Sequence, residues 1–157
     1  ADTEQKDAEK KPGRLMLFGC HLHPWKGEVN AAKRRKQIDR LYQVAVERQL
    51  SDYFVLLGDT NMRYDEEVAV VQDYDNNRLS CCWQIVPDAF KKNCMFTWYR
   101  NYFEVGAEGA SRFDKVFYGA KIKCVEVSVF DETVSDDKYH FLSDHRGVSV
   151  ILEIHND

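Results

Sequence analysis

The first half of the chain carries two apolar runs separated by a helical pattern. Residues 14–22 form an apolar run compatible with a strand, which stops at a loop marked by a proline and a glycine. Between residues 30 and 48 the apolar positions repeat as one amphipathic helical stripe, at Ile38, Leu41, Tyr42, Ala45 and Val46. The predicted strand DYFVLL, residues 52–57, is continuously apolar from Tyr53 on, which is typical of a strand covered on both faces. The predicted order is β-α-β, with a short helix over 65–71 behind it.

The second half of the chain is dominated by predicted strands. Short loops separate four of them, at residues 94–98, 112–118, 121–130 and 147–155. Within 121–130 three valines alternate with Cys124, Glu126 and Ser128, so we expect one apolar face and one partly wet face. A length of 157 residues corresponds to about one domain, so the pattern predicts an α/β (α+β) unit.

Composition and charge narrow the class of protein. The chain has no long apolar run, so we expect no membrane span. Its formal net charge of -4 gives no general attraction to nucleic acid, so any phosphate-binding surface must be local. Five cysteines without a CxxC pair predict reduced thiols in an intracellular protein, nuclear or cytoplasmic. Residues 1–13 are charged and end in Pro-Gly, which predicts a linker or a trimmed insertion.

Polar residues stand at the ends of several predicted strands and suggest phosphoryl chemistry. Asp59 and Asn61 follow the second apolar run directly. A carboxylate there can deprotonate a water, and a carboxamide can donate to a phosphate oxygen as charge builds. His145 would supply a proton or a cationic hydrogen bond while Asp114 holds its other ring nitrogen. Asp144 is a hard oxygen donor of the type that Mg²⁺ prefers.

Five blocks in a fixed order resemble one known family. They read CHLH, LGDTNMR, FTW, RFDKVFY and LSDHRGV, and they resemble the endonuclease/exonuclease/phosphatase superfamily of metal-dependent phosphoesterases. Thr60 within GDTN, Arg63 behind it and Thr97-Trp98 are similar to the tyrosyl-DNA phosphodiesterase branch, which cleaves 5′-phosphotyrosyl bonds. The resemblance implies that residues 14–157 form the C-terminal half of a four-layer α/β sandwich, with two stacked mixed sheets and outer helices.

The resemblance also implies a role for each residue at the strand ends. Asp59 would activate the attacking water, Asn61 would bind the phosphate, and His145, oriented by Asp114, would stabilise the transition state. Asp144 would belong to the shell of a Mg²⁺ ion, for which Mn²⁺ could substitute. The residues expected to contact the substrate are Arg63, Trp98, Arg112, Phe113 and His21.

The function implied is metal-dependent hydrolysis of a nucleic-acid end, specifically a 5′-phosphotyrosyl-DNA bond in DNA repair. Two departures qualify it. The main metal-binding Glu of the family belongs to an upstream half absent from this sequence, so that half is an expected partner besides DNA. In the tyrosyl-DNA branch a small hydroxyl residue follows the HLx block, whereas Pro24 stands there in this chain.

Several alternatives remain open at this stage. The same superfamily includes inositol-phosphate and phospholipid phosphatases, and a half-domain could also serve as a non-catalytic scaffold in a larger assembly. His21 and His23 share one strand face and could ligate zinc. The cationic run of residues 33–36 is either a solvated helix face or a contact for a phosphate-rich partner. The aspartate of GDTN, taken alone, could simply satisfy backbone donors in a turn.

Overall fold

The computed structural model describes residues 13–74, 79–87, 97–99, 110–130 and 145–155. A mixed four-stranded sheet forms its centre, in the order β1-β2-β6-β3. The first two strands are parallel and the other pairs are antiparallel. The bounds of the four strands are β1 Met16–His21, β2 Phe54–Asp59, β6 Asp114–Gly119 and β3 Leu79–Cys81.

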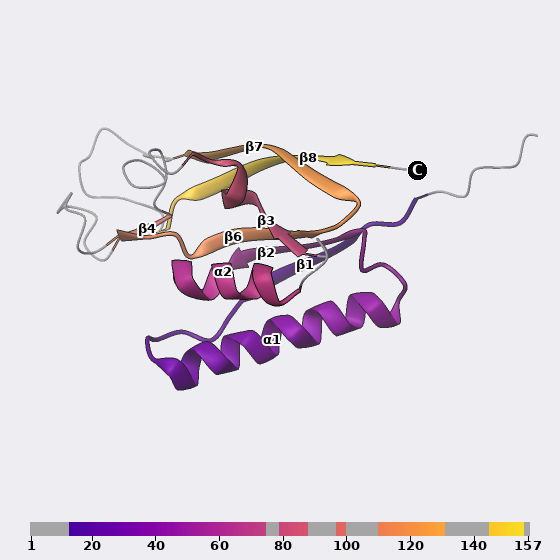
Figure 1. Cartoon of the computed structure of the whole chain (residues 1–157). Helices are drawn as coiled ribbons and strands as arrows, with labels where there is room; N and C mark the ends of the chain where they lie inside the picture. The colour runs from indigo at the N-terminus through magenta and orange to yellow at the C-terminus, as the bar shows by residue number, and fades with distance from the viewer. Residues whose placement is uncertain (1–12, 75–78, 88–96, 100–109, 131–144, 156–157) are drawn as a thin grey trace, which may run out of the picture.

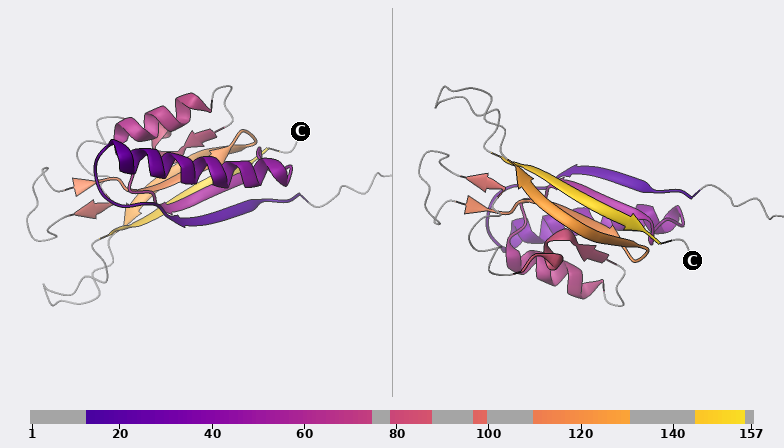
Figure 2. Two further views of the ribbon diagram at one scale, coloured as in Figure 1. Left: turned by 90° about the horizontal axis from the view of Figure 1, so that it is seen from below. Right: turned by 90° about the horizontal axis from the view of Figure 1, so that it is seen from above.

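Two helices cover one face of this sheet and a long hairpin lies over the other (Figure 1). The helices are α1, Glu28–Glu47, and α2, Tyr64–Asp73. The hairpin pairs β7, Ile122–Phe130, with β8, Gly147–Ile154. Figure 2 shows the helices and the hairpin on opposite sides of the sheet in both further views. A 3-10 turn, η1 at Cys82–Ile85, and a two-stranded ladder of β4, Trp98–Tyr99, with β5, Ala110–Ser111, complete the described elements.

The core between the sheet and α1 is aromatic. The Phe54 ring of β2 contacts the Phe18 and Tyr42 rings edge to face, each with a centroid separation of 5.8 Å. Ile38, from the predicted helical stripe, is fully buried beside them. Because apolar burial is the main favourable term in folding, this layer fixes the orientation of α1 on the sheet.

The opposite, inner face of the sheet is apolar but only partly covered. Strand register places Leu57 of β2 next to Val116 of β6. Val116 is buried on the side of the sheet that faces the hairpin. On the same face Leu17 of β1 is 62% exposed and Leu57 is 42% exposed. The apolar exposure lies toward the β1 edge of the sheet.

The predicted strands and helices are confirmed where the structure describes them, and the α+β class with them. α1 begins two residues earlier than expected, and β2 continues to Asp59. The strands β3 and β5 were not predicted, because segments of two or three residues carry no usable periodicity. Of the strand expected at 94–98, residues 94–96 lie outside the described residues, and so does the predicted linker up to residue 12.

The predicted alternation within 121–130 is wrong in its first half. Cys124 is 1% exposed and Val125 is 39% exposed, the reverse of the expected pattern. A bulge between Cys124 and Glu126 is responsible, since one extra residue turns the following side chains to the other face. Beyond the bulge Val127 and Val129 pack against the core as expected.

Two further expectations concern membrane spans and thiols. Among the described helices, none combines the length and the apolar content that a bilayer crossing requires. Cys20, Cys81, Cys82 and Cys124 are free thiols, and Cys94 lies outside the described residues.

Gly58 should be the least replaceable glycine of the sheet. Its φ is 133°, and a Cβ built there would lie 2.1 Å from the Cys20 carbonyl oxygen of β1. We expect Gly58→Ala to lower the free energy of unfolding by about 2 to 3 kcal/mol, measured by urea titration. Gly19→Ala in the neighbouring strand is the matched control, because nothing lies within 4 Å of its Cβ position. Equal effects of the two variants would contradict the close strand approach.

Candidate active site

Polar side chains meet where β1 and β2 end and β6 begins. Strand register places His21 beside Asp59 and Asp59 beside Asp114, so all three face the same side. The Nε2 atom of His21 lies 3.4 Å from Oδ2 of Asp59. Three neighbouring strands therefore contribute two carboxylates and an imidazole to one edge of the inner face.

His145 closes this group from the loop before β8. Its Nδ1 lies 2.7 Å from Oδ2 of Asp114, and its Nε2 lies 3.7 Å from Oδ2 of Asp59. An isolated β-bridge to Trp98 fixes its backbone. Because a carboxylate only accepts hydrogen bonds, Nδ1 carries the donated proton and Nε2 is left facing Asp59.

Asn61 leaves the strand geometry that the sequence suggested. Its φ of 51° is left-handed, a conformation that Asn tolerates better than most residues. Its backbone N–H donates to Oδ1 of Asp59 at 2.8 Å, and its Nδ2 donates to the Leu22 carbonyl at 3.1 Å. The turn thus ties the Asn61 backbone to the Asp59 carboxylate and the Asn61 side chain to Leu22, instead of placing Asn61 by alternation along a strand.

Two buried threonines tie the strand ends together. Both the backbone N–H and the hydroxyl of Thr60 donate to the Phe113 carbonyl, at 2.8 and 2.7 Å. The hydroxyl oxygen of Thr97 accepts the N–H groups of Phe113 and Asp114, each at 3.0 Å. Buried hydroxyls with such partners are costly to remove, so these contacts set the spacing of the two carboxylates.

Three of the predicted substrate-contacting residues form a stack next to this group. The Phe113 ring lies 5.4 Å from the Trp98 ring, and the guanidinium of Arg63 lies 5.0 Å from the Phe113 centroid. Burial lowers the pKa of Arg63, with the nearby Arg34 charge as a second cause. Phe113 itself is only 7% exposed, so Trp98 and Arg63 carry the accessible surface of the stack.

The remaining predicted residues are placed differently. Arg112 lies over the Trp83 ring at 5.6 Å, with a buried Nη1 that has no hydrogen-bond partner. The Nε2 of His23 meets the Asn30 side chain at 2.9 Å, whereas His21 faces Asp59, so the two histidines of the zinc alternative have different partners. Asp144 lies outside the described residues.

The fit to a metal ion can be judged from the donor atoms. Asp59 and Asp114 are hard oxygen donors of the kind that Mg²⁺ prefers. Within the ranges that the structure describes, no three His, Cys, Asp or Glu side chains gather closely enough to hold one ion. These residues therefore do not complete a metal site by themselves.

The Cys20 thiol lies close to the cluster but is poorly suited to act as a nucleophile. Burial, followed by the negative charges of Asp59 and Asp114, raises the pKa of its thiol to about 12. The thiolate is the reactive form of cysteine, and at neutral pH this side chain stays protonated.

The cationic run of residues 33–36 is partly structural. Arg34 is fully buried, and both oxygens of Glu66 accept from its guanidinium at 2.7 Å. Its Nη1 also donates to the carbonyls of His23 and Trp25, at 3.0 and 2.8 Å. Arg35 pairs with Asp39 and Asp73. No sequence signal linked Arg34 to Glu66, which lies 32 residues away.

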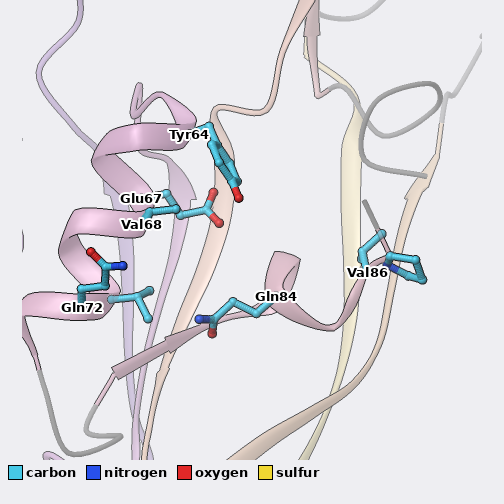
Figure 3. A pocket seen from close by; sticks show the side chains of 8 residues that line it. Tyr64, Glu67, Val68, Gln72, Gln84 and Val86 are labelled. Atoms are coloured by element: carbon cyan, nitrogen blue, oxygen red, sulfur yellow. The ribbon is translucent and has the colours of Figure 1, made fainter. Parts of the chain in front are cut away.

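A pocket of about 490 Å³ lies away from the strand-end cluster, between α2 and the η1 segment. Figure 3 shows that Tyr64, Glu67, Val68 and Gln72 approach it from α2, opposite Gln84 and Val86. None of the residues predicted for catalysis or substrate contact lines this pocket.

Comparisons with known proteins place this geometry in context. No protein-family model and no curated protein matches the chain. D. rerio TDP2 complexed with single-strand DNA product superposes with a TM-score of 0.63 at 23% identity, over 88% of this chain and 56% of that one. Truncated TDP2 from Caenorhabditis elegans gives 0.59 at 20% identity, over 88% and 54%. An endonuclease/exonuclease/phosphatase from Bacteroides vulgatus gives 0.57 at 15%, over 80% and 46%.

The chain spans about half the length of these proteins. Structures of TDP2, from the branch that the sequence resembles, stand among the neighbours together with other proteins of the superfamily. The chain therefore has part of the endonuclease/exonuclease/phosphatase fold, as the resemblance of its sequence implied.

Proposed function

We propose that this chain, together with a complementing half, is a metal-dependent phosphodiesterase that hydrolyses a 5′-phosphotyrosyl-DNA bond or a related nucleic-acid end. The observation that carries the proposal is the placement of His145 between Asp114 and Asp59. The backbone N–H of Asn61 donates to the Asp59 carboxylate beside it. The proposal includes a nuclear or cytoplasmic location, where DNA is repaired.

Each residue has a defined task in the proposed reaction. Asp59 accepts a proton from the attacking water through Oδ2, the oxygen that faces both imidazoles. Asn61 donates to a phosphate oxygen with the N–H that the Leu22 carbonyl does not use. His145 acts in its doubly protonated form: Nε2–H donates to the developing negative charge, while Nδ1–H donates to Asp114, which holds the ring in place.

The choice of a nucleic-acid substrate rests on the stack beside these groups. Trp98, Phe113 and Arg63 offer an aromatic and cationic wall, which suits a base or an aromatic leaving group. One structural neighbour, TDP2 of D. rerio, was solved with single-strand DNA product, and this supports the same substrate class. Inositol phosphates and phospholipid headgroups carry no aromatic ring that could stack on this wall.

The complementing half would pack on the exposed apolar face of the sheet. Leu17 and Leu57 are exposed on the same inner face that carries Asp59 and His21. Water-exposed apolar sheet surface of this kind is unfavourable, and a second sheet packed there would bury it next to the catalytic edge. The cofactor would be Mg²⁺, with Mn²⁺ as a substitute, held by Asp144 and by groups of that half.

The test is an assay of the full-length protein containing this chain on 5′-phosphotyrosyl DNA, abasic DNA and inositol phosphates. We expect turnover of the phosphotyrosyl substrate with Mg²⁺ or Mn²⁺ and its loss in EDTA. Turnover of inositol phosphates alone would show that the substrates are inositol phosphates and not nucleic-acid ends. Inactivity on every substrate with both metals would favour the scaffold alternative.

Asp114 should act only through His145. We expect His145→Ala to lower kcat strongly and Asp114→Ala to lower it by about 10- to 100-fold, the range seen for carboxylates that orient metal-binding imidazoles. The double variant should be no slower than His145→Ala alone, because an absent ring needs no orientation. Multiplying effects in the double variant, measured by initial rates, would show that Asp114 contacts the substrate independently.

A further inference from the structure

Trp25 is an exposed tryptophan on the loop between β1 and α1. It is 74% exposed, whereas Trp83 is fully buried and Trp98 is partly buried. Its φ of 77° lies in the left-handed region, which bulky residues rarely adopt. The chain therefore holds a large apolar side chain in water, in a conformation that its own backbone disfavours.

Arg34 of α1 holds the loop that carries Trp25. The buried Arg34 donates one nitrogen to the carbonyls of both His23 and Trp25, at 3.0 and 2.8 Å. The same guanidinium is fixed by the two oxygens of Glu66, each at 2.7 Å. Because a bidentate pair restrains a guanidinium plane, the loop backbone is preorganised, and only the Trp25 side chain has to be ordered when a ligand binds.

The loop begins at the catalytic edge. Leu22, three residues before Trp25, accepts from the Asn61 amide at 3.1 Å and donates to the Asp59 carbonyl at 2.8 Å. Three residues span at most about 11 Å. A stacked nucleic-acid strand advances about 3.4 Å per nucleotide, so Trp25 lies within about three nucleotides of a phosphate bound at Asn61.

We propose that Trp25 stacks on a nucleobase of the single-stranded segment next to the scissile phosphate. This inference rests on the function proposed above and names a contact for the substrate chain beyond the reacting bond. Every base has a π-face, so the contact is tolerant of sequence. The exposed Lys26 and Lys33 flank the loop and favour a phosphate backbone in a chain of net negative charge.

The position of Trp25 argues against the complementing half as its partner. The exposed Leu17 and Leu57 lie on the sheet face opposite α1, where that half would pack. Trp25 instead belongs to a loop bound by Arg34 of α1, on the helix side of the sheet (Figure 1). A nucleic-acid strand leaving the catalytic edge can pass over this side without displacing a protein layer.

The experiment measures hydrolysis by the full-length protein on 5′-phosphotyrosyl oligothymidylates of one to six nucleotides. We expect Trp25→Ala to raise KM about 5- to 150-fold on the longer substrates, with kcat and the single-nucleotide substrate unaffected. Trp25→Phe should keep most of the affinity. Val29→Ala, which trims another exposed apolar residue close by in the sequence, is the matched control and should change nothing. Unchanged KM values in Trp25→Ala, with an active parent, would overturn the inference and leave the proposed function standing.

A binding measurement separates the two proposals if the parent protein is inactive. Titration of the parent with fluorescently labelled oligothymidylate in EDTA, followed by anisotropy, should give a Kd that Trp25→Ala raises about 5- to 150-fold. A raised Kd in the variant supports stacking even without hydrolysis. An equal Kd in the parent and in Trp25→Ala, or no binding by the parent, overturns the role of Trp25.

Discussion

Replacing Asp59 with Asn should lower kcat by at least about a hundredfold while leaving the fold almost unchanged. The variant keeps the shape of the side chain, and its amide oxygen can still accept the Asn61 N–H that Asp59 accepts at 2.8 Å. It loses the basic oxygen that faces His21 and His145. Initial rates and urea titration on the same protein preparation measure the two effects, and the stability change should stay within about 0.5 kcal/mol.

The matched control is Asp73→Asn, which makes the same chemical change at an exposed acid paired with Arg35. It should alter neither rate nor stability appreciably. Asn61→Gly extends the test, because glycine tolerates the φ of 51° and only the amide is removed. A large loss of stability in Asp59→Asn, with activity per folded molecule preserved, would reduce GDTN to a structural turn.

Sequence patterns sufficed for the parts of the fold that repeat over many residues. The helical stripe around Ile38 and the apolar run before Gly58 each reflect burial against a neighbouring layer. Such a pattern can be recognised in the sequence without knowing which element packs against it. Sheet geometry accounts for part of the strand-end group, because β1 and β2 end and β6 begins at one edge. His145 joins the group from the loop before β8 of the separate hairpin, 86 positions from Asp59 in the numbering and 3.7 Å from it in space.

The details that fix the site were beyond reach, because they depend on pairings between distant segments. Thr97 looks like an ordinary strand residue until its hydroxyl is seen to accept two N–H groups of the Phe113–Asp114 segment. Arg34 sits in a run that reads as solvated cations, yet it is fully buried against Glu66. Side-chain type and spacing do not reveal which charged residue of a helix turns inward.

The largest stability effect should come from a second buried ion pair, between Lys115 of β6 and Glu67 of α2. Their charged atoms lie 2.5 Å apart, with Lys115 2% exposed and Glu67 4% exposed. Removing one partner of such a pair leaves an uncompensated charge in the interior, which costs about 3 to 5 kcal/mol. We therefore expect Lys115→Met to lower the free energy of unfolding by that amount, measured by urea titration.

The double variant Glu67→Gln with Lys115→Met should recover much of the loss, because it leaves no buried charge. Lys123→Met on the exposed side of β7 is the matched control and should stay within about 0.5 kcal/mol. Lys115 follows Asp114 in the chain but points to the opposite face, toward α2, so turnover per folded molecule should survive in all three variants. A loss below about 1 kcal/mol in Lys115→Met would mean that water reaches the pair. A loss of turnover without a loss of stability would instead connect α2 to the catalytic edge.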